Sequence, residues 1–271
     1  MSIGSATRSE FTKYFTTSAW WVLTLITVAA LALMSGGFAA AIGLAQTGAL
    51  DEVPDAALLG AAAPSLVYGL AVNIGYIFPI LLGVLLVTGE FRHHALIPTF
   101  LATPKRGTVL VAKLVTGAIV GAALGIVAVA ATVGTAAGVF AATGQDPELT
   151  TTDNLAMMGR MVLAFVLWTW VGLGLGSIVR NQVAAIVIAL VFTQLVEPLV
   201  RTAAAFAPAI EPAARYLPSA ASDTLVGSNF YVMLGASGEA QEWWVGAVIL
   251  AVYAVALTII GAVTTWRRDV D

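Results

Sequence analysis

The sequence predicts an all-α membrane protein with six transmembrane helices, an N-terminal amphipathic elbow helix and both termini in the cytoplasm. Charged residues make up 10% of the 271 residues and hydrophobic residues 59%, against about 25% and roughly 45–50% in soluble domains. The apolar residues also fall into six runs, each close to or above the about 20 residues that a helix needs to cross a bilayer. These observations exclude an ordinary soluble domain.

The first 19 residues predict a helix that lies in the membrane interface. Four positions at i, i+3, i+4 and i+7 give it a mostly apolar face: Phe11, Tyr14, Phe15 and Ser18. The alternative is a frayed cytoplasmic tail. Trp20 and Trp21 follow, and such amphipathic rings prefer the boundary of the bilayer.

Six spans are predicted in chain order, at residues 20–42, 66–88, 109–142, 157–179, 183–199 and 243–266. The first resembles a signal peptide, but its apolar run exceeds the 7 to 15 residues of a signal core, so we interpret it as a retained span. Pro79 predicts a kink in the second span. Gly117, Gly121 and Gly125 recur every fourth residue of the third, which favours packing within one chain over a dimer seam.

The segment 200–241 is predicted to be an extracellular surface or re-entrant segment, or a small cap. Three prolines separate its short alanine-rich pieces: Pro208, Pro212 and Pro218. The pieces are typical of shallow helices, and their apolar content is too high for a freely solvated linker.

The distribution of basic residues predicts the orientation. Six spans place both ends of the chain on one side, where nine basic residues are expected: Arg8, Lys13, Arg92, Lys105, Arg106, Lys113, Arg180, Arg267 and Arg268. Three are expected on the opposite side: Arg160, Arg201 and Arg215. Because positive residues are retained in the cytoplasm, both termini are predicted to be cytoplasmic.

Motifs for catalysis are missing from the sequence. No Gly-Lys pair occurs, so the chain has no phosphate loop, and the G-x-S-x-G and H-E-x-x-H motifs are also absent. With no cysteine there is no thiolate site. Glu90 and His94 could share a helical face, but two ligands are too few for a closed zinc site. We therefore expect no enzyme activity, no metal and no bound cofactor, and a net charge of -3 gives no reason to expect nucleic acid.

The predicted spans contain few ionisable residues, which argues against the proton or sodium relay of a secondary transporter. Polar candidates for a substrate pathway are Asn73, Tyr76, Gln194 and Glu197. The first three are more often hydrogen bonds between helices, worth about 0.6 kcal/mol each. Glu197 is interpreted as a solvated helix end, because a carboxylate at mid-bilayer costs roughly 2.5–3.5 kcal/mol. A substrate contact is the alternative.

A polar stretch, residues 90–113, separates the second and third spans and holds both histidines. Its centre has a small apolar face at i, i+3 and i+4 with basic residues around it: Ile97, Phe100 and Leu101, flanked by Arg92, Lys105 and Arg106. This pattern is typical of a short helix that docks into a groove on a soluble partner. An interfacial loop held by lipid headgroups is the alternative.

The stretch GEFRHHALIPTFLATPKRGTVLVAKL resembles the segment between the second and third spans of ABC-2 type transporter permeases. That family has a GE(F/Y)R start, a T-[FL]-L-x-T-P-x-R centre and a following V-L-x-A-K-L. RSEFTKYFTTSAWWVL resembles the family's elbow helix, and ARYLPSAASDTL resembles its segment before the last span. One departure is that Ser18 and Ala19 stand where the elbow usually carries a basic residue.

The resemblance implies one permease domain over residues 1–271, in a bacterial plasma membrane. It implies a dimer with a second permease copy, and two copies of a cytoplasmic ABC ATPase that carry the ATP and Mg. It further implies export along spans 1, 2 and 5. The apolar, charge-poor pathway favours a lipophilic or amphipathic substrate, such as a drug, peptide or lipid-like molecule. A membrane scaffold or immunity protein, or a secondary transporter, is the alternative function.

The resemblance also implies that the loop 89–108 includes the coupling helix that receives the movement of the ATPase. The residues expected to take part in this coupling are Glu90, Arg92, His94, Ile97, Phe100, Leu101, Pro104, Lys105 and Arg106.

Overall fold

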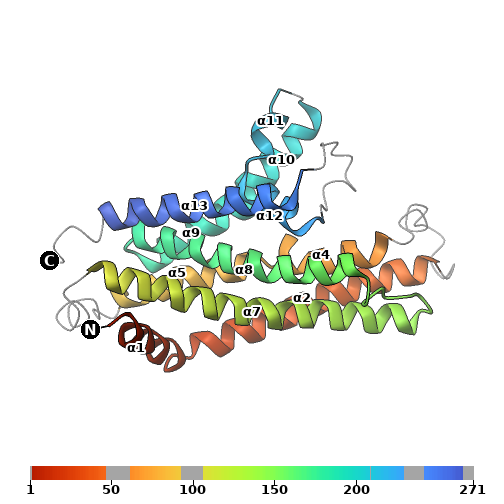
Figure 1. Ribbon diagram of the computed structural model, residues 1–271. Helices are drawn as coiled ribbons and strands as arrows, with labels where there is room; N and C mark the ends of the chain where they lie inside the picture. Colours follow the sequence, from red (N-terminus) through yellow and green to blue (C-terminus); the bar gives the residue numbers. More distant parts are fainter. Residues whose placement is uncertain (1, 47–61, 93–105, 208, 229–240, 265–271) are drawn as a thin grey trace.

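The computed structural model describes residues 2–46, 62–92, 106–207, 209–228 and 241–264, and every regular element in these ranges is a helix (Figure 1). The predicted all-α class is therefore confirmed for this part of the chain. Six helices are long and apolar enough to cross a membrane: Ala19–Gln46, Ala63–Phe91, Gly107–Ala142, Thr152–Ile178, Gln182–Ala204 and Trp243–Thr264. They match the six predicted spans in number and order.

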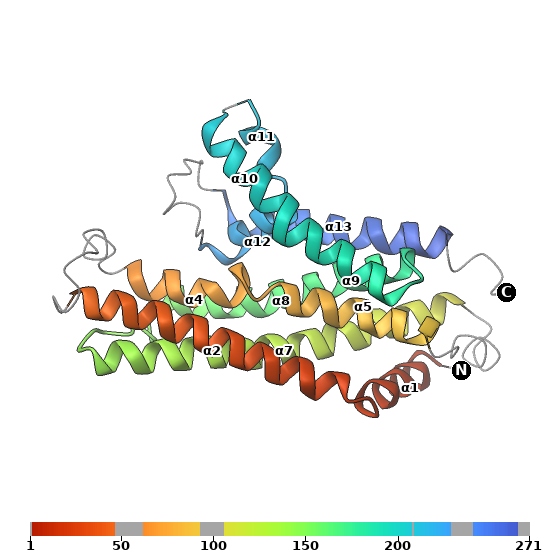
Figure 2. The same cartoon turned by 180° about the vertical axis from the view of Figure 1, so that it is seen from behind.

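The first helix, α1 (Ile3–Phe15), begins at Ser2, whose hydroxyl accepts a hydrogen bond from the backbone N–H of Ser5 and so caps the helix. The predicted helix at the N-terminus is thus present. Its apolar face is divided, because Phe11 and Tyr14 pack against the core while Phe15 is exposed. The helix lies against one end of α7 in both views (Figures 1 and 2).

Most of the long helices run side by side along one axis (Figure 1). They are α2 (Ala19–Gln46), α4 (Ala63–Asn73) with α5 (Ile77–Arg92), α7 (Arg106–Ala142), α8 (Thr152–Ile178) and α13 (Trp243–Thr264). The central helix is α8, which packs against α5, α7 and α13.

The fifth span is continuous but irregular and runs obliquely to the others (Figure 2). It consists of α9 (Gln182–Val191), the π-helical turn η2 (Phe192–Val196) and α10 (Glu197–Phe206). This rod is longer than the predicted 183–199. After it come α11 (Glu211–Ala214) and α12 (Pro218–Val226), which are the short helices expected after residue 200.

The contact between α5 and α8 is close enough to require glycine on both sides. A Cβ atom on Gly83 would lie 2.1 Å from the carbonyl oxygen of Thr169, and one on Gly172 would lie 2.2 Å from that of Ile80. Neither separation is possible for real atoms, so the two backbones are in direct contact. Small residues permit such an approach between membrane helices.

The glycines of the third span also pack within the chain, as predicted. A Cβ atom on Gly117, Gly121 or Gly125 would come within 2.5 Å, 2.5 Å and 2.9 Å respectively of a side chain on α8. The stripe is therefore the seam between α7 and α8.

The second span is broken between α4 and α5. Pro79 has no N–H to donate to Gly75, whose carbonyl instead accepts from Phe78 at 3.1 Å. One turn earlier, the N–H groups of Ile74 and Gly75 both donate to the carbonyl of Leu70, at 3.2 and 3.4 Å. The predicted kink is confirmed, and it lies on the N-terminal side of the proline.

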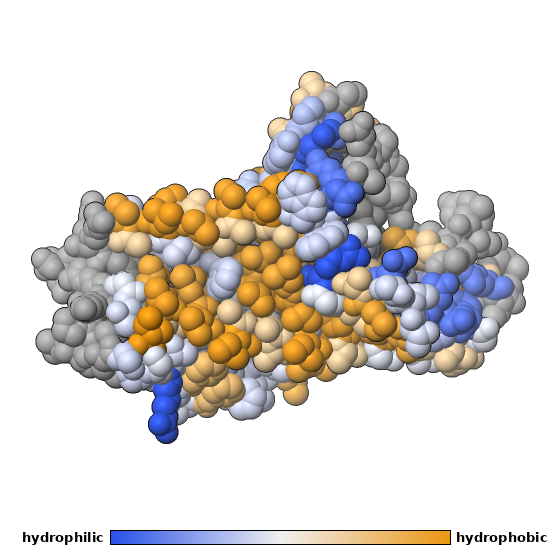
Figure 3. Space-filling view, viewed as in Figure 1, coloured by the Kyte–Doolittle hydropathy of each residue, from blue (hydrophilic) through white to orange (hydrophobic). Residues whose placement is uncertain are grey.

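The face of the bundle seen in Figure 3 is largely apolar. Large hydrophobic side chains on the spans are highly exposed, including Leu33 at 76% and Val183 at 70%. Hydrophilic residues gather around α10 to α12 and at one end of the bundle (Figure 3). Apolar exposure on this scale fits helices surrounded by lipid.

Candidate functional site

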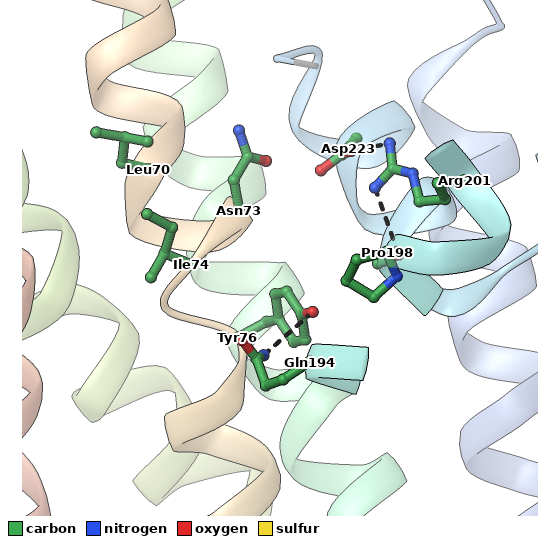
Figure 4. A pocket seen from close by; sticks show the side chains of 9 residues that line it. Leu70, Asn73, Ile74, Tyr76, Gln194, Pro198, Arg201 and Asp223 are labelled. Carbon is green, nitrogen blue, oxygen red and sulfur yellow. Dashed lines mark hydrogen bonds and ion pairs between the residues drawn. The ribbon is translucent and has the colours of Figure 1, made fainter. Parts of the chain in front are cut away.

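Polar side chains meet where the break in the second span faces the π-helical turn of the fifth. Between them lies a cavity of about 180 Å³, which we call the polar cavity (Figure 4). Its polar lining is Asn73, Tyr76, Gln194, Arg201, Ser219 and Asp223. Interrupted helices and π-helical turns both recur at functional sites of membrane proteins.

Two of the predicted pathway residues join helices across the polar cavity. The Tyr76 hydroxyl donates to the carbonyl of Thr193 at 2.9 Å, and Gln194 Nε2 donates to the Tyr76 hydroxyl at 3.4 Å. The Tyr76 ring stacks on Trp168 of α8 with centroids 4.9 Å apart. The interpretation of Tyr76 and Gln194 as bonds between helices is therefore right.

Asn73 is different, because its side chain makes no bond to another helix. Its Nδ2 and Oδ1 atoms are both buried and have no hydrogen-bond partner among the described residues. The residue is the last of α4, immediately before the break, and its side chain lies across the gap from Asp223 and Arg201 (Figure 4). Asn73 thus lines the polar cavity with an amide that is buried and has no partner in the part of the chain that the structure describes.

The prediction for Glu197 as a solvated helix end is wrong, since its side chain is fully buried at 0% exposure. The fifth span continues past it to Phe206, and α12 folds back over it. Its Oε1 atom accepts from the backbone N–H of Ser219 at 3.0 Å, in the first turn of α12. An anionic side chain is favoured at that end of a helix.

Arg201 and Asp223 form a buried ion pair beside Glu197, which the sequence did not indicate. Arg201 Nη2 lies 2.6 Å from Asp223 Oδ2, and the side chains are 9% and 6% exposed. Burial raises the pKa of Asp223 to about 6, although the Arg201 guanidinium opposes that shift. Next to the pair, Trp168 donates to the hydroxyl of Ser222 at 3.0 Å and holds α12 against α8.

A second polar cluster, which we call the ion network, lies at the C-terminal end of the second span. Its members are Glu10, Lys13, Glu90 and Lys113. Lys13 Nζ lies 2.7 Å from Glu10 and 2.6 Å from Glu90, while Lys113 Nζ lies 2.6 Å from Glu10 and 2.9 Å from Glu90. Each ammonium therefore bridges both carboxylates, and the four formal charges cancel.

The ion network is largely excluded from solvent. The side chain of Lys113 is 1% exposed, and its Nζ also donates to the carbonyl of Leu86 at 3.2 Å. Burial acts to raise the pKa of Glu10, but the Lys113 and Lys13 ammonium groups outweigh it and hold that pKa below its ordinary value. Burial acts to lower the pKa of Lys13, but Glu90 and Glu10 outweigh it and raise that pKa.

Comparison with known proteins adds no family to this geometry, because no protein-family model matches the chain and the curated proteins include no similar sequence. The ABC-2 resemblance therefore stays a prediction.

The spans do contain few ionisable residues, as expected, but three of these are buried inside the bundle. Glu90, Lys113 and Glu197 lie inside three of the six apolar helices and are buried. The composition of the spans did not identify these three residues as buried charges, because each is a single charged residue within a long apolar run. Their burial is possible because they are paired or hydrogen-bonded.

Of the residues predicted to couple to an ATPase, only Glu90 has a described side chain, and it belongs to the ion network. Arg92 ends α5 and Arg106 begins α7. The remaining six lie outside the described residues: His94, Ile97, Phe100, Leu101, Pro104 and Lys105. In the ranges that the structure describes, no group of three or more acidic or histidine side chains could hold a metal ion.

Proposed function

We propose that the chain is the membrane permease subunit of an ATP-driven ABC exporter, located in a bacterial plasma membrane with both termini in the cytoplasm. The observation that carries this proposal is the ion network. It joins α1 to the last turn of α5 and to α7, and residues 93–105 connect those two helices. This connecting segment is the one that resembles the family's coupling segment.

In this proposal, the ion network transmits a movement of that segment to the spans. Lys113 binds Glu90 of α5 and Glu10 of α1 at the same time, so the three helices move together. In the proposed cycle, ATP and Mg bind to two copies of a cytoplasmic ATPase, whose closure displaces residues 90–106. The spans of this chain and of a second permease copy then alternate between inward and outward access.

The polar cavity supplies the substrate contact in this proposal. It lies between the second and fifth spans, two of the three that the family resemblance assigns to the route. A small polar site within apolar walls suits a lipophilic or amphipathic substrate that enters from the surrounding lipid.

Affinity purification of the tagged chain in mild detergent tests the proposal. We expect a nucleotide-binding subunit to copurify, because the chain has no phosphate loop of its own. Reversing the charges of Lys105 and Arg106 is expected to abolish stimulation of its ATPase activity while the spans still insert. Arg215→Glu, in an exposed pair with Glu211, is the control and should leave that stimulation unchanged. Recovery of the chain alone, under conditions that preserve other membrane complexes, contradicts the proposal.

A secondary transporter is the second candidate, and the buried Glu197 favours it. A carboxylate enclosed within a span, with one oxygen unpartnered among the described residues, is the kind of group that carries protons in ion-coupled transporters. Transport that survives ATP depletion but stops when the ion gradient is collapsed would select this candidate over the ABC exporter.

A further inference from the structure

The contact that holds α1 onto the bundle is small. Of its 13 residues only Ala6 and Glu10 are buried, while Phe11 and Tyr14 are partly buried against the core. A short exposed turn, residues 16–18, joins α1 to α2. Segments with few buried apolar contacts open locally, at a lower free energy than the whole fold. The ion network therefore contributes a large share of what holds α1 in place.

The ion network divides along the surface of α1 into two neutral halves. Lys13 contacts Oε1 of Glu10 at 2.7 Å within α1 itself, and Lys113 contacts Oε2 of Glu90 at 2.9 Å within the bundle. The two contacts that join the halves use the other oxygen of each carboxylate, Glu10 Oε2 with Lys113 and Glu90 Oε1 with Lys13. If α1 leaves, each carboxylate thus keeps one ammonium.

This division removes the usual obstacle to separating buried charges. Removing one partner of a buried ion pair is costly because a charge is left uncompensated. Release of α1 breaks two ion contacts but leaves no charge of the ion network without a partner. The apolar side chains of α1 stay out of water as well, because Phe11 and Tyr14 can join the exposed Ile3 and Phe15 in the membrane interface.

We propose that α1 is a releasable helix, which rotates as a unit about the turn 16–18 from its site against α5 and α7 into the membrane interface, while the six spans stay folded. While α1 is docked, Glu10 and Lys13 bridge the Glu90–Lys113 pair and the three helices move together. After release, that pair is the one contact of the ion network that joins α5 to α7. Resting on the proposed function, α1 thereby regulates how tightly the two helices on either side of the coupling segment are held together.

A matched pair of carboxylates separates this proposal from a purely structural role. Glu10 and Glu90 have side chains 6% and 7% exposed, and each contacts both ammonium groups. Glu10→Gln and Glu90→Gln therefore leave the docked network with the same charges, two ammonium groups and one carboxylate. The two variants differ after release. With Glu10→Gln the bundle keeps a neutral ion pair, whereas with Glu90→Gln it keeps Lys113, which is 1% exposed, without a carboxylate.

The test labels a single cysteine on α1 in the full chain in lipid nanodiscs. The chain has no cysteine of its own, so Ala6→Cys, at a position 6% exposed on the docked face, reports release through its rate of modification by N-ethylmaleimide. Ser177→Cys is the reference, because Ser177 is 1% exposed on α8 and packs against Gly261 of α13. We expect Ala6→Cys to react at least about tenfold faster than Ser177→Cys, which requires the bundle itself to open.

The matched carboxylate variants are then compared in the Ala6→Cys background. Glu10→Gln is expected to raise the modification rate at least about tenfold, and Glu90→Gln to raise it less than about threefold. Thermal unfolding shows that each variant is folded at the temperature of labelling. The lysines provide a second comparison, since Lys13→Met also leaves a neutral pair in the bundle and Lys113→Met does not.

Equal modification of Ala6→Cys and Ser177→Cys overturns the releasable helix. So does a rate that Glu10→Gln fails to raise, or an equal increase from Glu10→Gln and Glu90→Gln. Labelling is measured on the chain without any partner. Its failure therefore leaves the coupling to an ATPase standing, and failure to recover an ATPase subunit leaves the release of α1 standing.

Discussion

Replacing Lys113 by methionine tests whether the ion network holds α1 onto the bundle. Methionine keeps most of the length of the lysine side chain but removes the ammonium that is 1% exposed and bridges Glu10 and Glu90. The two carboxylates, each less than 8% exposed, then share only Lys13, which is 35% exposed. The network changes from neutral to a net formal charge of -1.

The cost follows from the burial of the charges that remain. Removing one partner of a buried ion pair typically costs about 3–5 kcal/mol, because a charge is left uncompensated. At about 2–4 °C per kcal/mol for a chain of this size, the melting temperature should fall by about 6–20 °C. The double variant Lys113→Met with Glu90→Gln restores neutrality, and it should be less destabilised than the sum of the two single variants.

The assay is thermal unfolding of purified protein in detergent, followed by tryptophan fluorescence. Arg215→Ala is the matched control, because it breaks the exposed pair with Glu211, whose side chains are 34% and 36% exposed. An exposed pair is worth about 0–1 kcal/mol, so this variant should melt within about 4 °C of the wild type. If Lys113→Met melts no lower than Arg215→Ala, the ion network does not stabilise the fold and the reasoning fails.

Three further outcomes are expected. Gly172→Ala should destabilise the fold by about 1–3 kcal/mol or more, because its Cβ would meet a backbone carbonyl of α5. The Cβ of Gly134→Ala would meet nothing within 4 Å, so this control should not destabilise the fold. Thermal unfolding compares the two variants. Asp223 has a pKa of about 6 when folded and 3.8 as its ordinary value. The free energy of unfolding should therefore decrease as the pH rises from about 4 to 6 and then level off. Asp223→Asn should lose this decrease. A cysteine at Glu148 should react with an impermeant thiol reagent in intact cells, and labelling of one at Lys105 instead would reverse the orientation.

The six spans could be predicted because each depends on composition within a single window of the sequence. The same holds for the kink before Pro79 and for the stripe that begins at Gly117, since both are local patterns. Their partners were not predictable in the same way. That Gly117 packs on α8 depends on which helices become neighbours, and the sequence indicated only that some close neighbour was required.

The polar sites were predicted in part. Asn73, Tyr76 and Gln194 stood out as polar residues in apolar runs, and the structure places all three at one cavity. Glu197 was misplaced because its burial depends on α12, which returns over the fifth span and contributes Ser219 from 22 residues away. No periodicity signals such a return.

The ion network escaped the sequence for a similar reason. Lys13 and Glu90 are 77 positions apart, and Glu10 and Lys113 are 103 apart. A count of charges on each side of the membrane treats every lysine alike. It had no means to separate Lys113, which is buried between carboxylates, from a solvated lysine.

The glycine contact between α5 and α8 restricts how the molecule can deform. With Gly83 and Gly172 holding two backbones in touch, the helices interlock and resist sliding, because any axial shift would drive a neighbouring side chain into a carbonyl group. Gly174 against Leu257 and Gly261 against Ser177 attach α13 in the same way. The helices α5, α8 and α13 therefore form one rigid unit. The oblique fifth span has no glycine with which to interlock in this way, and it contributes one wall of the polar cavity.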